Sequence, residues 1–548
     1  MTLFELWAEA VRRHALRPAL GWVDETAWSY SELDQRIRTI QVHFARLGLA
    51  SGDRLALWSH NHPAWGAVYL AVTTSGAVIV PLLPEFPVAE TAQAIIHSGA
   101  KVLVLSKALR DVWVEYIPQA PDELKTALQE VTVLLLDELA EAPPLPPVLQ
   151  TGPLPTESTL AAIIYTSGTT GKPKGVMLSH RNLTSNVNAA APIPRLQPGN
   201  RLLSVLPLAH TYECTLGLLI PLSLGCQVSY LRKQPAPAVL IPALASVRPH
   251  AMLTVPLFIE KIYRQKILPS LQKQPVKVLL KVPLLRSLIL RRAGHKLKSL
   301  MGGRIHFFGI GGAGLAPEVA RFLHKSGFPY AIGYGLTESS PLLAGHLGVK
   351  LYSTGKVLTG VRIKIAEPLN EEGAGEILAQ GPNIMMGYYK DPERTAEVLS
   401  ADGWLRTGDL GRFDRHGHLH IVGRSKNMIL GPGGENIYPE PIEALYNQDQ
   451  LIVETLVLHN GSHLVAKVVV DHETLPDKLA PWGRDLGKAL EAYLENMKHL
   501  INKRLARFSH ISHVEVQDKP FEKTATMKIK RYLYEKSHGK GRKGQMGT

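Results

Sequence analysis

The feature that most constrains the fold is a regular alternation of helical patterns with short apolar segments in the first 110 residues. Apolar segments lie at Arg54–Trp58, 77–82 and 101–105, with helical periodicity between them. This pattern is typical of a parallel sheet in which helices connect the strands and cover both faces of the sheet. The alternation resumes later, with strands predicted at residues 161–165, 201–206 and 227–231. The sequence therefore predicts an α/β fold of layered, mostly parallel sheets with helices.

Changes of texture along the chain predict its domains. A proline-rich connector covers residues 143–155, and short strands with turn signals at 352–421 predict an antiparallel, small β-barrel-like subdomain. We expect a large N-terminal domain, a small mobile α+β C-terminal domain and a disordered basic tail. Their predicted bounds are 1–425, 426–535 and 536–548.

Composition excludes several classes of protein. Of the 548 residues, 45% are hydrophobic and 20% charged, which a fibrous or disordered chain does not have. Cys214 and Cys226 are too few for a disulfide framework or a cysteine-based zinc cluster. The first residues lack the apolar core of a secretory signal. We therefore expect a cytoplasmic protein.

Two uncharged stretches, 63–84 and 214–231, have to be weighed as membrane spans. A spanning helix needs about 20 mostly apolar residues, whereas both stretches are interrupted by glycine and proline. We expect each to be a buried helix that leads into a buried strand.

The net charge of +14 is unevenly distributed. Residues 261–304 contain 12 Lys or Arg and no Asp or Glu, with apolar residues interleaved and Pro283 interrupting any continuous helix. Such a block is either a solvated basic face or a surface for peripheral contact with anionic lipid at the inner face of the membrane. No helix-turn-helix, zinc-finger or aromatic RNA-binding signature accompanies it, so no nucleic-acid partner is expected.

The strongest chemical signal is the segment 165–175, Tyr-Thr-Ser-Gly-Thr-Thr-Gly-Lys-Pro-Lys-Gly, after an apolar strand. Its glycines let backbone N–H groups approach phosphate oxygens, while its hydroxyls donate hydrogen bonds and its lysines neutralise charge. Its spacing is not that of a Walker A loop. The segment predicts a polyphosphate site at Thr166, Ser167, Gly168, Thr169, Thr170, Gly171, Lys172 and Lys174.

This segment resembles the phosphate loop of the adenylate-forming superfamily of acyl-CoA synthetases, luciferases and peptide-synthetase adenylation domains. The family's other motifs follow in order as 309–314 (GIGGAG), 333–338 (GYGLTE), 407–409 (TGD) and 423–426 (GRSK). The resemblance covers nearly the whole chain. It implies ATP, Mg²⁺ and coenzyme A as cofactors.

The resemblance assigns roles that the residue types also fit. Tyr334 offers a flat face for adenine, Glu338 a carboxylate for Mg²⁺, and Asp409 with Arg424 a polar pair for ribose. Lys426 is the implied hinge. The remaining implied residues are Gly312 and Ala313 at the adenine edge, Gly335 beside the base, Thr337 at the α-phosphate, Thr166 near the metal and His210 near the acyl group.

Lys528 is implied as the catalytic lysine. The segment 522–531 (EKTATMKIKR) resembles the family's final lysine motif, and Lys528 stands at the matching position before isoleucine. The usual preceding glycine is Met527 here, which affects the flexibility of the loop rather than its chemistry. Lys523, Lys530 and Arg531 lie nearby, so the assignment depends on the motif's register.

Three histidines, His416, His418 and His420, alternate along a predicted strand, which would place their rings on one side as metal ligands need. No carboxylate or cysteine partner is evident in the sequence. The resembled family has a plain hairpin here, and we expect the same.

The implied enzyme is an acid–thiol ligase that forms acyl-AMP and then acyl-CoA. No Asp occurs between residues 200 and 255, and Glu213 is the only acid there before Glu260, which disfavours an amino-acid substrate. The apolar runs 215–220 and 253–258 favour a fatty acid, and the motifs resemble those of bacterial long-chain fatty-acid–CoA ligases.

Other functions stay open. The acceptor could be an acyl-carrier protein, and the enzyme could be a luciferase-like oxygenase or an aryl-acid ligase. A non-catalytic lipid- or nucleotide-binding relative is disfavoured because the chain keeps Thr337, Glu338, Asp409, Arg424 and Lys528.

Overall fold

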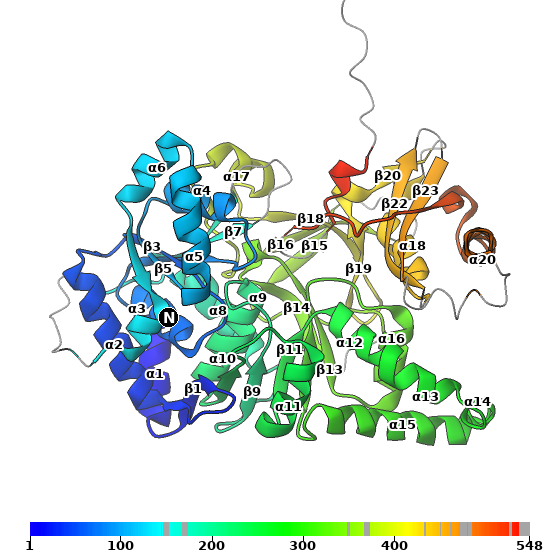
Figure 1. The fold of residues 1–548 in the computed structure, drawn as a ribbon, viewed down its shortest axis with the longest axis horizontal. Helices are drawn as coiled ribbons and strands as arrows, with labels where there is room; N and C mark the ends of the chain where they lie inside the picture. Colours follow the sequence, from blue (N-terminus) through cyan, green and yellow to red (C-terminus); the bar gives the residue numbers. More distant parts are fainter. Residues whose placement is uncertain are drawn as a thin grey trace, which may run out of the picture. The chain divides into compact units, whose positions relative to one another are not determined.

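A computed structural model describes most of the chain, in two compact units (Figure 1). The described residues are 1–143, 145, 153–166, 174–347, 351–366, 373–431, 435–449, 451–460, 463–471, 479, 485–524 and 529–535. The large unit comprises Met1–Ala366, Glu376–Thr407 and Arg412–Ile421. The small unit comprises Glu367–Gly375, Gly408–Gly411 and Val422–Thr548. The predicted boundary at residue 426 stays a prediction, and the tail 536–548 lies outside the described residues.

The large unit contains a seven-stranded sheet in the order β17-β8-β7-β4-β3-β5-β6. Neighbouring strands from β7 to β6 are parallel, and β7–β8 and β8–β17 are antiparallel. Its strands are β3 (Arg54–Trp58), β4 (Val78–Leu82), β5 (Ala100–Leu105), β6 (Thr132–Leu135), β7 (Leu160–Thr166), β8 (Lys174–Ser179) and β17 (Gly387–Tyr388).

An eight-stranded sheet in the order β14-β13-β12-β11-β9-β10-β1-β2 forms a second layer. Its six central strands, from β13 to β1, pair in parallel, and the two edge pairs are antiparallel. Its strands are β1 (Pro18–Trp22), β2 (Trp28–Ser29), β9 (Arg201–Ser204), β10 (Gln227–Tyr230), β11 (Ala251–Thr254), β12 (Phe307–Ile310), β13 (Tyr330–Gly335) and β14 (Leu342–Leu347). The predicted α/β class with mostly parallel sheets is confirmed.

Helices cover these sheets. The α-helices of the large unit are α1 (Leu3–His14), α2 (Tyr30–Arg46), α3 (Pro63–Thr74), α4 (Val88–Ser98), α5 (Lys107–Tyr116), α6 (Asp122–Gln129), α7 (Leu136–Glu141), α8 (His180–Ala190), α9 (Thr211–Glu213), α10 (Ile220–Ser223), α11 (Pro237–Val247), α12 (Pro256–Ile262), α13 (Leu268–Gln272), α14 (Val276–Leu279), α15 (Pro283–Leu300), α16 (Pro317–Ser326) and α17 (Pro392–Val398). Short 3₁₀-helices are η1 (Ile117–Gln119) and η4 (Thr337–Ser339), and π-helices are η2 (Cys214–Leu219) and η3 (Tyr263–Ile267).

Helix α3 lies between the two sheets, because it contacts β4 of one and β1 of the other. Every residue from Pro63 to Thr74 is buried, as expected of a helix that is apolar on all sides. The first uncharged stretch is therefore a buried helix followed by the buried strand β4, as predicted. The second is the π-helix η2 and α10 followed by β10. Among the described residues, no helix is both long and apolar enough to cross a membrane.

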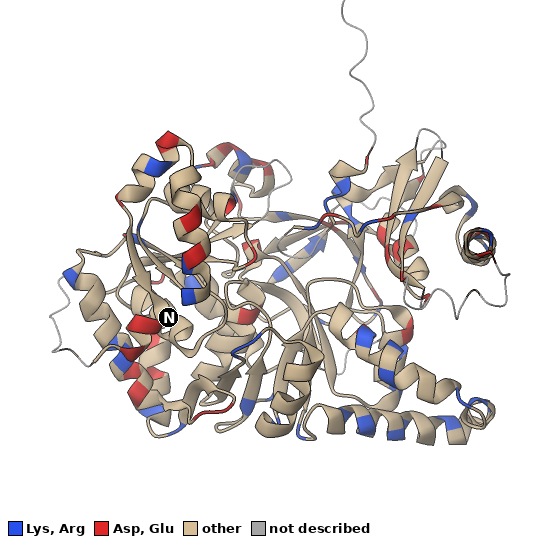
Figure 2. Ribbon diagram, in the orientation of Figure 1, with Lys and Arg blue, Asp and Glu red and all other residues tan. Residues whose placement is uncertain are grey.

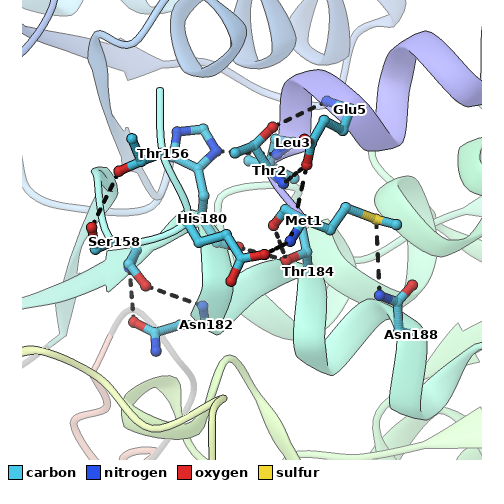
Figure 3. Close-up of polar contacts among 12 residues, drawn as sticks. Met1, Thr2, Leu3, Glu5, Thr156, Ser158, His180, Asn182, Thr184 and Asn188 are labelled. Atoms are coloured by element: carbon cyan, nitrogen blue, oxygen red, sulfur yellow. Dashed lines mark hydrogen bonds and ion pairs between the residues drawn. The ribbon is translucent and has the colours of Figure 1, made fainter. Parts of the chain in front are cut away.

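The start of the chain is tied to helix α8 (Figure 3). The Leu3 N–H donates to Nδ1 of His180 at 3.1 Å, and the Thr184 hydroxyl donates to the carbonyl oxygen of Met1 at 2.8 Å. These contacts hold the helix that follows β8 in the sequence against the N-terminal segment.

Antiparallel structure appears within residues 352–421, the region for which it was predicted. A four-stranded sheet has the order β15-β16-β18-β19, and β15 pairs with β16 in antiparallel fashion. Its strands are β15 (Arg362–Ile365), β16 (Gly375–Gln380), β18 (Leu405–Phe413) and β19 (Leu419–Arg424).

The small unit has its own core. In its three-stranded sheet, β22 and β23 are antiparallel and β23 and β24 are parallel. Helices α18 and α20 supply apolar residues to the same cluster as these strands. Its elements are η5 (Ser425–Asn427), β20 (Ile429–Leu430), β21 (Asn436–Ile437), α18 (Pro439–Tyr446), β22 (Ile452–Asn460), β23 (His463–Val470), α20 (Leu486–Asn502), η7 (Arg507–Ser509), β24 (Ile511–Val516) and η8 (Arg531–Leu533).

Candidate active site

The two ends of the predicted phosphate loop face each other across a hairpin. Thr166 ends β7 and pairs with Lys174, the first residue of β8. At Gly175 a Cβ atom would lie 2.8 Å from the Ile163 side chain, so the start of β8 requires glycine. The predicted residues Ser167, Gly168, Thr169, Thr170, Gly171 and Lys172 lie outside the described residues.

Lys174, Glu338 and Tyr388 form a polar cluster beside this hairpin. Lys174 Nζ and the Tyr388 hydroxyl donate to Glu338 Oε1 at 3.0 and 2.9 Å, and Lys174 Nζ lies 4.1 Å from the centre of the Tyr388 ring. Burial and the nearby carboxylate raise the pKa of Tyr388, so its hydroxyl keeps its proton and remains a donor. The Met385 N–H fixes the backbone of Glu338 by donating to its carbonyl oxygen at 2.9 Å.

Two buried asparagines hold the turn that carries Glu338. Asn383 Nδ2 donates to the carbonyl oxygens of Ser339 and Leu342 at 2.9 and 3.1 Å. Asn186 Nδ2, on helix α8, donates to the same two oxygens at 3.3 and 2.7 Å. A buried carbonyl without a partner is costly, so these amides fix the path of the turn and with it the position of the carboxylate.

Gly335, at the end of β13, has no space for a side chain. A Cβ atom there would lie 1.9 Å from the carbonyl oxygen of Pro341. The neighbouring Tyr334 is buried, with 8% of its surface exposed. Because so little of Tyr334 is exposed, its stacking on adenine stays a prediction.

The segment around His210 lies against the same turn. The Thr211 hydroxyl donates to the Thr337 hydroxyl at 3.4 Å, and the Tyr212 N–H donates to Nδ1 of His210 at 3.2 Å. The neutral His210 ring therefore carries its proton on Nε2. Two predicted residues, His210 and Thr337, are thus brought together by Thr211.

Tyr212 joins this segment to the predicted adenine-edge loop. A Cβ atom at Gly309 would lie 3.0 Å from the Tyr212 hydroxyl, and one at Gly311 would lie 3.0 Å from Cζ of its ring. Gly312 has a φ of +87°, which favours glycine. Gly312 and Ala313 are exposed, where their backbone is accessible to a nucleotide.

A narrow apolar cavity of about 30 Å³ lies behind Tyr212. Its walls carry no Lys, Arg, Asp or Glu, and several wall positions are glycines. The π-helix η2 contributes Leu216 to the wall. The lining residues are Ala190, Ile193, Pro194, Tyr212, Leu216, Ile220, Phe307, Gly309, Ala331, Ile332, Gly333, Leu342, Gly345 and His346.

The small unit holds the predicted ribose pair together. Arg424 Nε lies 3.3 Å from Asp409 Oδ1, and the Ser425 hydroxyl donates to the Gly408 carbonyl at 3.0 Å. Lys426 follows in the 3₁₀-helix η5, where it is exposed. Its role as a hinge stays a prediction.

Two of the three basic residues named near the predicted catalytic lysine are held by carboxylates of the small unit. Lys523 pairs with Glu454, and Arg531 Nη2 donates to both oxygens of Glu443 at 2.5 and 2.6 Å. Lys528 itself lies outside the described residues.

The three histidines do not share one strand face, so that expectation is wrong. His416 lies in the turn after β18, and β19 begins at Leu419. The predicted absence of a carboxylate partner is also wrong, because Asp414 lies 3.3 Å from His418 Nδ1 and 3.5 Å from His420 Nε2. No cluster suited to a metal ion occurs among the described His, Cys, Asp and Glu residues. The region is the expected hairpin.

The fold and these groups define an adenylate-forming enzyme. The large unit brings Lys174 of the β7–β8 hairpin to the carboxylate of Glu338, and the small unit contains the Asp409–Arg424 pair. Residues 7–389 match the family model of the AMP-binding enzymes. The chain belongs to this family, as the sequence predicted.

Known relatives fall into more than one substrate class. The chain is 31% identical to feruloyl-CoA synthase of Amycolatopsis sp. over 79% of this chain and 81% of that protein. It is 28% identical to the peroxisomal long chain acyl-CoA synthetase 7 of Arabidopsis thaliana, over 88% and 75% of the two chains. The crystal structure of ATP-bound MatB from Rhodopseudomonas palustris is similar, with a TM-score of 0.76 and 25% identity over 97% and 98%. ATP, Mg²⁺ and coenzyme A are the cosubstrates and metal of such ligases.

Sequence reasoning missed four residues of this site. Tyr388, Asn186 and Asn383 reach the Glu338 turn from distant segments, and Tyr212 lies beside the predicted residue His210 in the sequence. The one local signal was Tyr212, an aromatic two residues after His210.

Proposed function

We propose that this chain activates a carboxylic acid with an apolar tail, a fatty acid in the first instance, and transfers it to coenzyme A. The observation that carries the proposal is the cavity beside Tyr212, whose lining contains no Lys, Arg, Asp or Glu and has His346 as its one histidine. Tyr212 lies two residues after His210 in the sequence. A second carboxylate or an amine in the tail would be buried there with no Lys, Arg, Asp or Glu beside it, which is costly.

Glu213 does not supply such a partner. It is fully buried, it accepts a hydrogen bond from Ser204 at 2.6 Å, and it does not line the cavity. Burial raises its pKa to about 8, so it is neutral at pH 7. An amino-acid substrate is disfavoured for this reason as well.

An aryl acid such as ferulate is the second candidate. At about 30 Å³ the cavity holds little more than water, so both a long acyl chain and an aromatic ring require its walls to move. The wall segment η2 is a π-helix, a rare form that often occurs at functional sites, and its displacement would lengthen the cavity for an acyl chain.

The residues at the hairpin fit Mg-ATP. Mg²⁺ is commonly bound by one or two carboxylates together with phosphate oxygens, and Glu338 is a carboxylate held in place by Tyr388 and by the backbone of its turn. When bound, the metal would neutralise charge on the phosphate oxygens. Lys174 is the described cation beside this carboxylate, and the loop from Thr166 to Lys174 would hold the phosphates.

Lys528 is proposed to bridge the carboxylate and the α-phosphate oxygens when acyl-AMP forms. Ion pairs occupy Lys523 and Arg531, and the register of the motif favours Lys528 over Lys530 as the acting cation. The small unit would then rotate about Lys426, bringing residues 433–435 to the thiol. The proposed domains remain 1–425 and 426–535.

Lys528→Ala should lower acyl-AMP formation by about 10²–10³-fold, the usual effect of removing one group that stabilises a transition state. Thioester formation from supplied acyl-AMP should be largely retained, because only the first step uses this charge. Lys530→Ala is the matched control. Equal loss of both half-reactions would contradict the assigned role.

The substrate is tested with a panel of acids in a pyrophosphate-release assay. Octanoate, dodecanoate, hexadecanoate, ferulate and malonate are compared, each with coenzyme A and with an acyl-carrier protein as acceptor. The proposal requires the highest kcat/KM with a fatty acid and coenzyme A. Preference for ferulate would establish the second candidate, and preference for malonate would contradict an uncharged tail pocket.

A further inference from the structure

Helix α15 is anchored at one end only. In its C-terminal half, Gly294 and Leu297 are buried, and Leu290 and Leu300 pack on the large unit's core. All residues from 281 to 288 are exposed. Figure 1 shows α14 at the tip where the chain turns from α13 into α15. We call residues 276–292 the basic tip.

The basic tip exposes large apolar side chains at closely spaced positions. Leu284 exposes 82% of its surface, Leu288 55%, Val278 54% and Val282 47%. Single exposed apolar residues are common on protein surfaces, whereas a cluster of them marks an interaction site. Leu284 and Leu288 are four residues apart on α15, so they project from the same side of the helix.

The charge of the tip has one sign. Figure 2 shows Lys and Arg, and no Asp or Glu, on α14 and α15. No described residue forms an ion pair with the side chains of Lys277, Lys281, Arg286, Arg291 and Arg292. The complementary surface is therefore anionic, and it also has to accept apolar side chains.

We propose that the basic tip docks this protein on the surface of a lipid bilayer that contains anionic lipids. Leucines placed among cations can enter the boundary between headgroups and acyl chains while the cations contact lipid phosphates. Nucleic acid would satisfy the charges but would offer no apolar region to Leu284 or Leu288. The contact is peripheral, and it does not depend on which acid the enzyme activates.

The test is co-sedimentation with vesicles of phosphatidylcholine alone or mixed with phosphatidylglycerol. The protein should sediment with the mixed vesicles at low salt, at least about tenfold more than with phosphatidylcholine, and should be released as salt screens the charges. Arg286→Gln/Arg291→Gln/Arg292→Gln should abolish most of this binding. Leu284→Ser/Leu288→Ser should weaken it and make the residual binding more sensitive to salt.

The matched control removes three exposed cations elsewhere in the large unit, as Lys107→Gln/Arg110→Gln/Lys233→Gln, and should bind almost as the parent protein does. Thermal melting by circular dichroism shows that each variant folds. Absence of binding, binding that salt does not change, or equal loss in the control would overturn the proposal. Tighter binding to duplex DNA than to vesicles, unaffected by the serine substitutions, would overturn it in favour of nucleic acid.

Discussion

Two buried glutamates of the large unit are held in opposite ways. Glu338 accepts hydrogen bonds from a lysine and a tyrosine at one oxygen, and its turn is fixed by two asparagines. Glu213 accepts one bond from Ser204, and its Oε2 has no partner among the described residues. A Cβ atom at Gly217 would lie 2.6 Å from Glu213 Oε1, so the carboxyl is enclosed by helix backbone.

The difference shows how partners decide the role of an acid. A carboxylate that a lysine and a tyrosine hold by hydrogen bonds is positioned to bind a metal ion. An enclosed carboxyl without a cation takes up a proton, and burial raises the pKa of Glu213 to about 8. Glu338 is therefore suited to the reaction, and Glu213 to packing.

The largest expected effect is that of Glu338→Gln. The exchange keeps the shape of the side chain and removes its charge, so acyl-AMP formation should fall by about 10²–10³-fold and require more Mg²⁺. A magnesium titration of the initial rate measures both effects. Glu213→Gln is the matched control, with activity close to that of the parent protein. Similar losses in the two variants would remove the distinction between the glutamates.

Tyr388→Phe should have an intermediate effect. The variant loses one donor to Glu338 but keeps the ring on which Lys174 lies, so the rate should fall about tenfold. A hydrogen bond to a charged group is worth about 1.5–3 kcal/mol, and Lys174 still holds the carboxylate. The measurement is kcat against Mg²⁺ concentration. Tyr389→Phe removes a hydroxyl that donates to the carbonyl oxygen of Ser98 at 3.4 Å, and it should leave the rate unchanged. An equal effect of both variants would contradict the assignment.

Glu213→Gln should have the smallest effect on activity. It should, however, change how the free energy of unfolding depends on pH. Burial raises the pKa of Glu213 from its ordinary value of 4.5 to about 8 in the folded protein, so the folded state binds more protons than the unfolded state between these two pH values. The protonated carboxyl's contribution to stability is complete below pH 4.5 and is lost as pH rises through 8, by at most about 1.4 kcal/mol per pH unit.

Urea unfolding at a series of pH values measures the slope of the free energy of unfolding against pH. The glutamine variant does not titrate, so its free energy of unfolding should lack that part of the slope. An unchanged slope in the variant would show that Glu213 is charged in the folded protein.

Local patterns predicted the strands and the motif residues, because the sequence signal for each lies within a few neighbouring residues. Arg54–Trp58 is a strand at the predicted bounds, and the buried helix in 63–84 follows from its uniform apolarity. The contacts that complete the site join distant segments: Asn186 reaches Leu342 and Tyr388 reaches Glu338 only after the sheets have paired. Sequence reasoning has no local signal for such contacts.

The wrong prediction for the three histidines has a similar cause, over a shorter stretch of the sequence. Alternation over five residues suggested one strand, but Asp414 accepts backbone N–H bonds from His416 and His418 at 2.8 and 3.0 Å. A side chain that caps a turn in this way ends the strand. A strand pattern interrupted by an Asp and a Gly predicts a hairpin better than a metal site.

The most direct test of the central claim is isotope exchange between labelled pyrophosphate and ATP in the absence of coenzyme A. If acyl-AMP forms as a separate first step, exchange should require both Mg²⁺ and the acid, should proceed without coenzyme A, and should be lost in Glu338→Gln but not in Glu213→Gln. Exchange that needs coenzyme A, or that occurs without an acid, would contradict acid activation at this site.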